Sequence, residues 1–230
     1  MATGPVNNNP YLQQVLFQNL SSTNVQPNQL KTSAQLISSA FAAKSGIATI
    51  SANGAKLNNV SQTIRASGDM QAYEGFQTAV RSASAASDPL QLVRFSNSAD
   101  FVARTDSQML SDTFSSLARI SGGNNDALTQ SFNATFTSTV EKAGIEGLAL
   151  FNRGVEAVEK ADYSGSGVTQ AENLQKFFTL TRSINSTGES EAEITGNLER
   201  LVKGAELAGS ADEIWRYFSD FVGPDPDNIG

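Results

Sequence analysis

No proline occurs between residues 90 and 223 of this 230-residue chain. Proline removes a backbone hydrogen-bond donor and breaks helices, so a long proline-free stretch rich in alanine and leucine favours helix. Apolar residues within this stretch recur at helical spacing, as Leu128, Phe132 and Phe136 do. The sequence therefore predicts an all-α fold.

Helix starts and ends are marked most clearly in the second half of the chain. A hydroxyl residue followed three positions later by glutamate favours a capping box, in which the two residues satisfy free N–H groups at a helix start. The pattern occurs at Thr169 with Glu172, at Ser190 with Glu193 and at Ser210 with Glu213. Glycines at positions 122, 123, 188 and 209 are typical of helix ends.

These signals predict one helical domain with a tail at each end. We expect a mainly antiparallel helical bundle of about seven to nine helices over residues 10–222. Residues 1–9 and 223–230 are predicted to be disordered tails. Asp88-Pro89 has the pattern of a further helix start, and a division into two sub-bundles near 88–89 stays open.

Composition excludes most catalytic chemistry. The chain has no cysteine and no histidine, which removes disulfides, thiolate nucleophiles, Cys/His zinc sites and imidazole bases. It also lacks the usual phosphate-binding and nucleophile motifs, and the paired carboxylates Glu156 and Glu159 are interpreted as part of a solvated helix face. No apolar run approaches the roughly 20 residues that span a bilayer, and no secretory signal is recognised. We expect a protein that is not an enzyme, needs no cofactor and has no membrane span.

Charge is distributed unevenly along the chain. Residues 1–68 contain four basic residues and no acidic one, whereas the remainder contains 12 basic and 23 acidic residues. The first segment either packs against the acidic remainder or faces a separate protein partner. Four cations spread over 68 residues form no basic stripe, and the sequence pI of about 4.6 disfavours nucleic acid as a partner.

The first segment also contains one short amphipathic helix pattern. Its apolar positions, which we take as candidate partner-binding residues, are Tyr11, Leu12, Val15, Leu16 and Leu20. Uncharged polar residues (Ser, Thr, Asn and Gln) make up 77 of the 230 residues, which is more familiar in exported or particle proteins than in cytosolic enzymes.

This acid-free, amide-rich and hydroxyl-rich start, together with the missing cysteine, resembles substrates of bacterial type III and flagellar-type export, including harpin-like proteins. The resemblance is compositional and covers mainly the first 60 or so residues. It implies a secreted, non-enzymatic protein that acts through protein–protein contacts. The alternative is a structural protein of a virion, particle or filament, which would share the amide-rich surface; the sequence does not indicate the oligomeric state.

One loop resembles a calcium site of the EF-hand family. Asp162, Ser164 and Ser166 match the first, third and fifth positions of that family's loop, and Gly167 matches its turn glycine. The family places a bidentate glutamate at the twelfth position, whereas here Glu172 comes one residue early. The resemblance implies calcium ligands at Asp162, Ser164, Ser166 and Glu172, and thus a calcium-associated binding module. The preferred interpretation is a loop whose Thr169 and Glu172 cap the following helix.

A weak internal echo is also present. Leu-Gln pairs begin apolar segments at Leu12, Leu90 and Leu174, and the pattern from Phe76 to Val80 resembles that from Phe151 to Val155. Secure repeats share longer patterns than this, so the sequence alone leaves a true repeat open.

Overall fold

The computed structural model describes residues 47–221 except residue 89, residues 123–125 and residue 189. The described part contains eight helices and no strand. The helices are α3 (Ile47–Ser67), α4 (Met70–Ala85), α5 (Leu90–Thr105), α6 (Ser107–Ile120), α7 (Asp126–Lys160), α8 (Gln170–Thr187), α9 (Glu191–Leu207) and α10 (Ala211–Asp220). The predicted all-α, mainly antiparallel bundle is confirmed.

Helix α7 reverses direction at Gly144. That residue has φ 56° and ψ −145°, a conformation outside the helical region and favoured by glycine. The rings of Phe132 and Phe151 lie 5.3 Å apart between centroids. In a straight helix, 19 residues would separate their backbones by about 28 Å. The two halves of α7, residues 126–143 and 145–160, therefore lie side by side and antiparallel.

With α7 divided in this way, the described helices from α3 to α9 form four successive pairs, and α10 packs against α8 and α9 of the last pair. The pairs are α3 with α4, α5 with α6, the two halves of α7, and α8 with α9. First helices contact first helices along the row, as when Gln175 of α8 donates to Ser131 in the first half of α7 at 2.9 Å. Second helices do the same, as when Arg119 of α6 donates to Glu159 in the second half of α7 at 3.1 Å.

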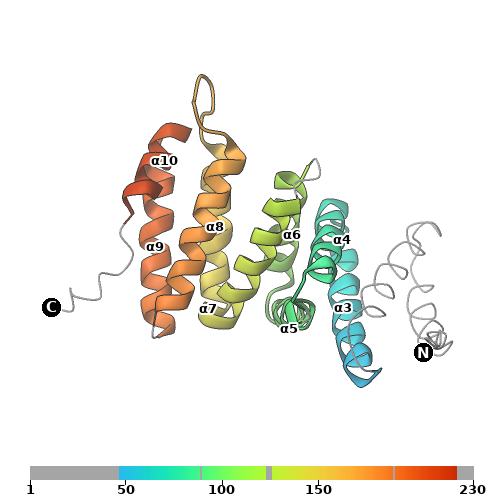
Figure 1. Cartoon of the computed structure of the whole chain (residues 1–230). Coiled ribbons are helices and arrows are strands. Elements are labelled where there is room, and N and C mark those ends of the chain that lie inside the picture. Colours follow the sequence, from blue (N-terminus) through green and yellow to red (C-terminus); the bar gives the residue numbers. More distant parts are fainter. Residues whose placement is uncertain (1–46, 89, 123–125, 189, 222–230) are drawn as a thin grey trace, which may run out of the picture.

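Figure 1 shows this row running from α3 and α4 on the right to α9 and α10 on the left. Helical repeat proteins stack pairs of helices in the same manner, so that each pair contacts mainly its neighbours. The weak sequence echo falls on equivalent helices of this row. Leu90 and Leu174 lie on the first helices α5 and α8, whereas Phe76 and Phe151 lie on the second helix of the first and third pairs.

Buried phenylalanines line the core along the row. Phe76, Phe95, Phe114 and Phe136 contact one another with ring centroids 5.4 to 6.5 Å apart. A second group of buried phenylalanines lies next to the first along the row, one helical turn away on α7. It consists of Phe132, Phe151, Phe177, Phe178 and Phe218. Because α4 and α5 share the first group, the core is continuous across residues 88–89.

Helices α4 and α6 approach each other closely at Gly75. A Cβ atom at Gly75 would lie 1.8 Å from the carbonyl oxygen of Phe114, so only glycine lets the two backbones approach this closely. The side chain of Asp69 begins α4 by accepting the Ala72 N–H, and its second carboxylate oxygen accepts the Ser115 hydroxyl of α6. Local capping and helix packing therefore reinforce each other at this contact.

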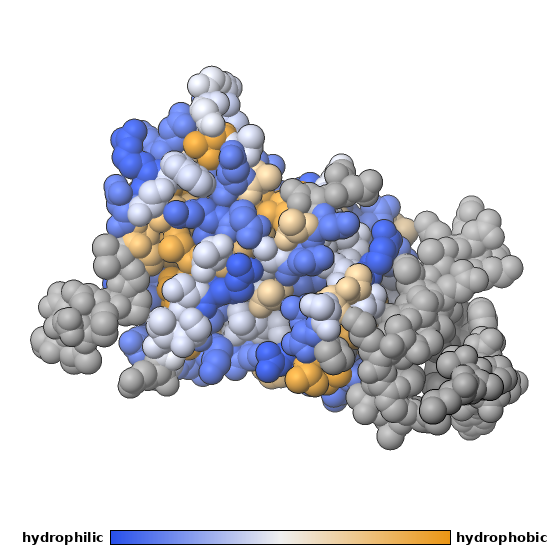
Figure 2. Space-filling view, in the orientation of Figure 1, coloured by the Kyte–Doolittle hydropathy of each residue, from blue (hydrophilic) through white to orange (hydrophobic). Residues whose placement is uncertain are grey.

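The surface is mainly hydrophilic on the face that Figure 2 shows, with hydrophobic residues exposed only in small patches. On α10, Phe218 is buried, whereas Trp215 is 36% exposed and its ring lies under the ammonium group of Lys176. No helix within the described ranges combines the length and the apolar character that crossing a membrane needs.

Candidate functional site

The loop between α7 and α8, which includes the predicted calcium ligands Asp162, Ser164 and Ser166, is hydrogen-bonded to the start of α10. Asp162 accepts the backbone N–H of Ser164 at 2.8 Å through its side chain and that of Ala211 at 2.9 Å through its carbonyl oxygen. The Ser166 hydroxyl donates to Asp212 at 2.8 Å. The oxygens of Asp162 and Ser166 thus serve loop closure.

Glu172 is occupied by the helix start. Its carboxylate accepts the Thr169 hydroxyl at 2.7 Å and the Thr169 N–H at 2.8 Å, and these bonds lower the pKa of Glu172. The Thr169 hydroxyl oxygen accepts the Glu172 N–H, which completes a capping box. Within the described ranges, no group of three or more aspartate, glutamate, histidine or cysteine side chains gathers where a metal could bind. The capping interpretation is confirmed, and calcium binding stays a prediction.

Substitution of the cap tests this interpretation. Thr169→Ala should lower the free energy of unfolding by about 0.5–2 kcal/mol, because it leaves the Glu172 N–H at the start of α8 without its acceptor. Urea denaturation followed by circular dichroism measures the change, with and without added calcium. Thr179→Ala is the matched control, because Thr179 is exposed in the middle of α8 and caps nothing. Equal losses in the two variants would contradict the capping role.

The candidate partner-binding residues Tyr11, Leu12, Val15, Leu16 and Leu20 lie outside the described residues, as do both predicted tails.

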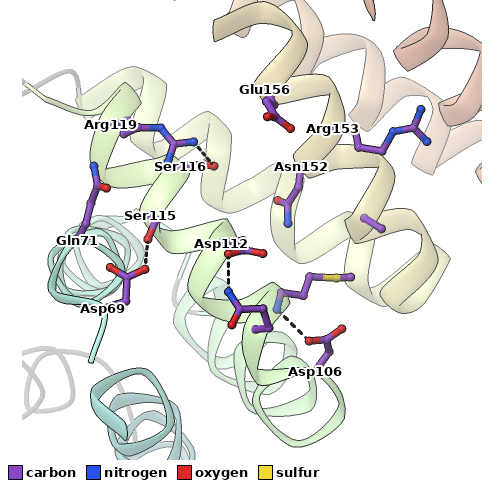
Figure 3. Close-up of a pocket in the computed structure, with 13 residues that line it drawn as sticks. Asp69, Gln71, Asp106, Asp112, Ser115, Ser116, Arg119, Asn152, Arg153 and Glu156 are labelled. Carbon is purple, nitrogen blue, oxygen red and sulfur yellow. Dashed lines mark hydrogen bonds between the residues drawn. The ribbon is translucent and has the colours of Figure 1, made fainter. Parts of the chain in front are cut away.

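The main concave features of the described part adjoin the second half of α7. One hollow of about 670 Å³ lies between α4, α6 and α7, and a second of about 740 Å³ lies between α7 and α9. A smaller hollow of about 280 Å³ continues toward the end of α9. All three share Arg153, and we call their combined lining the α7 surface. Figure 3 shows the first hollow, with Arg119 on the α6 wall and Arg153 on the α7 wall.

Two arginines of the α7 surface join neighbouring second helices. Arg119 donates two hydrogen bonds to Glu159, at 3.1 and 3.0 Å, and Arg153 donates two to Glu206, at 3.0 and 2.8 Å. These bonds raise the pKa of both arginines. Because paired bonds between a guanidinium and a carboxylate fix orientation as well as charge, each arginine is held against its own partner. The side chain of Glu159, predicted to be solvated, is only 14% exposed.

Acidic residues outnumber basic ones on this surface. Eight carboxylate residues and three basic residues line the three hollows. The acidic ones are Asp69, Asp106, Asp112, Glu146, Glu156, Glu191, Glu199 and Glu206. With Arg119 and Arg153 held by glutamates, the surface presents net negative charge to an approaching ligand.

Asp69 connects this surface to the stability of the fold. Its partial burial alone would raise its pKa, but hydrogen bonds from the Ser115 hydroxyl and from the N–H groups of Ala72 and Gln71 together lower the pKa below its ordinary value. A carboxylate whose pKa is lower in the folded state stabilises the fold above the unfolded pKa. That stabilisation is lost as the pH falls through the folded pKa.

The free energy of unfolding should therefore fall more steeply with acid in the unmodified protein than in Asp69→Asn. The difference between the two proteins should be largest at neutral pH and should shrink between about pH 5 and pH 2. Urea denaturation at a series of pH values measures both curves. Parallel curves over this range would show that the Asp69 carboxylate contributes no pH-dependent stability.

Comparison of the chain with protein-family models, with curated proteins and with solved structures finds no match.

Proposed function

We propose that this protein is a non-catalytic, exported bacterial protein that acts through protein–protein contacts, as a substrate or accessory of type III or flagellar-type secretion. The observation that best supports contact-based action is the row of helix pairs. Its second helices place three adjoining hollows along one side of the molecule. Stacked helix pairs commonly provide extended binding surfaces of this kind.

The same row is well suited to export. An exported chain of this type passes through its channel unfolded and refolds afterwards. A chain without cysteine has no disulfide to break, and helix pairs that contact mainly their neighbours have low contact order, which allows rapid refolding. The acid-free start of the chain supports the same proposal, because it differs in charge from the body that follows.

An export assay tests the proposal. The full chain is produced in a bacterium with an intact type III apparatus and in a matched strain whose export ATPase is inactivated. The proposal expects the chain in the medium of the first strain only, with a cytosolic marker retained in both. Retention in both strains, or equal release from both, would contradict it. Fusion of residues 1–46 to a reporter then shows whether the acid-free start is sufficient for export.

A further inference from the structure

We infer that the α7 surface is a docking site for a lysine-rich or arginine-rich segment of a partner protein. This inference rests on the proposed contact-based function and adds the place of contact and the chemistry of the partner.

The shape of the α7 surface favours an extended peptide segment as its ligand. The hollows of about 670 and 740 Å³ flank the second half of α7 and have Ala149 and Arg153 in common. They therefore adjoin across one helix ridge and reach from α6 to α9. A peptide segment laid across this ridge would place side chains in both hollows, whereas a small molecule would occupy one.

The charge of the α7 surface favours a cationic partner. The groups that could bind an anion, Arg119 and Arg153, are already held in two-bond pairs by Glu159 and Glu206. The exposed carboxylates of Asp112 in the first hollow and Glu199 in the second have no cationic partner of this kind. An incoming ammonium or guanidinium group meets exposed carboxylates in both hollows, which lie near Arg119 and Arg153 but are not paired with them, and an incoming acidic group would be repelled.

Apolar side chains also line the two hollows, beside the carboxylates. Met109 and Ala149 line the first hollow, and Ala149 and Leu150 line the second. Lysine and arginine pack their methylene stems along apolar surface while their charged ends stay near carboxylates. Each hollow has both an apolar lining and exposed carboxylates, which favours lysine and arginine side chains over a small inorganic cation.

A binding experiment on the full chain tests the inference independently of export. The probe is a short fluorescein-labelled peptide of alternating lysine and alanine, followed by fluorescence anisotropy at low salt. A peptide with glutamate in place of lysine is the probe control. We expect saturable binding of the lysine peptide only, with affinity that falls as salt is raised.

Two matched variants locate the binding. Asp112→Asn combined with Glu199→Gln removes one carboxylate from each hollow and should weaken binding by about tenfold. Glu74→Gln combined with Asp220→Asn removes the same charge from exposed positions on α4 and α10, outside the three hollows, and should leave binding nearly unchanged. All four residues are exposed, so circular dichroism should show both variants folded.

Absence of saturable binding by the unmodified chain would overturn the inference, and so would equal weakening in the two variants, which would indicate attraction to net charge alone. Neither result would bear on whether the chain is exported, and failure of export would leave this binding result intact.

Discussion

Replacement of Phe114 by alanine should lower the free energy of unfolding by about 3–5 kcal/mol, the range for removing a buried phenylalanine ring. The Phe114 side chain is fully buried on α6. Its ring lies 5.4, 6.1 and 5.7 Å from those of Phe76, Phe95 and Phe136, which belong to α4, α5 and α7. The substitution therefore opens a cavity where three neighbouring helix pairs meet. Urea unfolding followed by circular dichroism measures the loss.

Phe101→Ala is the matched control, because Phe101 lies on α5 and is 47% exposed. Removal of an exposed ring leaves no cavity, so the loss should stay below about 1 kcal/mol. A small loss for Phe114→Ala, similar to that of the control, would show that the aromatic cluster does not hold the helix pairs together.

Replacement of Gly144 by alanine should lower the free energy of unfolding by about 1–3 kcal/mol. The conformation of Gly144, with φ 56° and ψ −145°, is one that residues with a Cβ atom rarely adopt. The destabilisation should arise from backbone strain alone, because a Cβ atom there would meet nothing closer than a carboxylate oxygen of Glu191 at 3.4 Å. Urea unfolding measures this change also.

Gly196→Ala separates strain from the general effect of adding a methyl group. Gly196 is exposed within α9, and a Cβ atom there would meet nothing within 4 Å. Alanine is the better helix former by about 1 kcal/mol, so this variant should be as stable as the unmodified protein or more so. A stabilising effect at both positions would mean that α7 is continuous through residue 144.

Local signals allowed much of the fold to be predicted. The capping box of Thr169 and Glu172 is present. At Ser190 and Ser210 the hydroxyls accept the N–H groups of Glu193 and Glu213 as predicted, whereas the Glu213 carboxylate accepts the N–H of Gly209 instead of completing a box. These contacts join residues three apart, so their pattern is visible in the sequence. The reversal at Gly144 was not predicted, because one glycine between Ala143 and Ile145 looks the same in a continuous helix. The reversal depends on contacts between residues far apart in the sequence, such as the contact between Phe132 and Phe151.

The α7 surface could not be predicted for the same reason. Arg119 and Glu159 are 40 residues apart, and Arg153 and Glu206 are 53 apart. Carboxylates such as Glu156 have the helical spacing of an ordinary solvated face, and Glu156 does pair with Lys160 four residues later. Only the stacking of α6, α7 and α9 brings these groups around shared hollows. The sequence shows which residues are charged, and the fold determines which of them meet.

The row of helix pairs and the α7 surface both depend on the antiparallel course of α7, because this places α6, the second half of α7 and α9 next to one another. The chain has no cysteine, so cysteines introduced at the exposed positions Gln130 and Glu156 would be the only sites for spin labels. Pulsed electron–electron double resonance then measures the distance between the labels. Two packed antiparallel halves place them within about 25 Å, whereas a straight α7 would separate the two backbones by about 39 Å. A distribution centred at the longer distance would contradict the row of helix pairs and the α7 surface built on it.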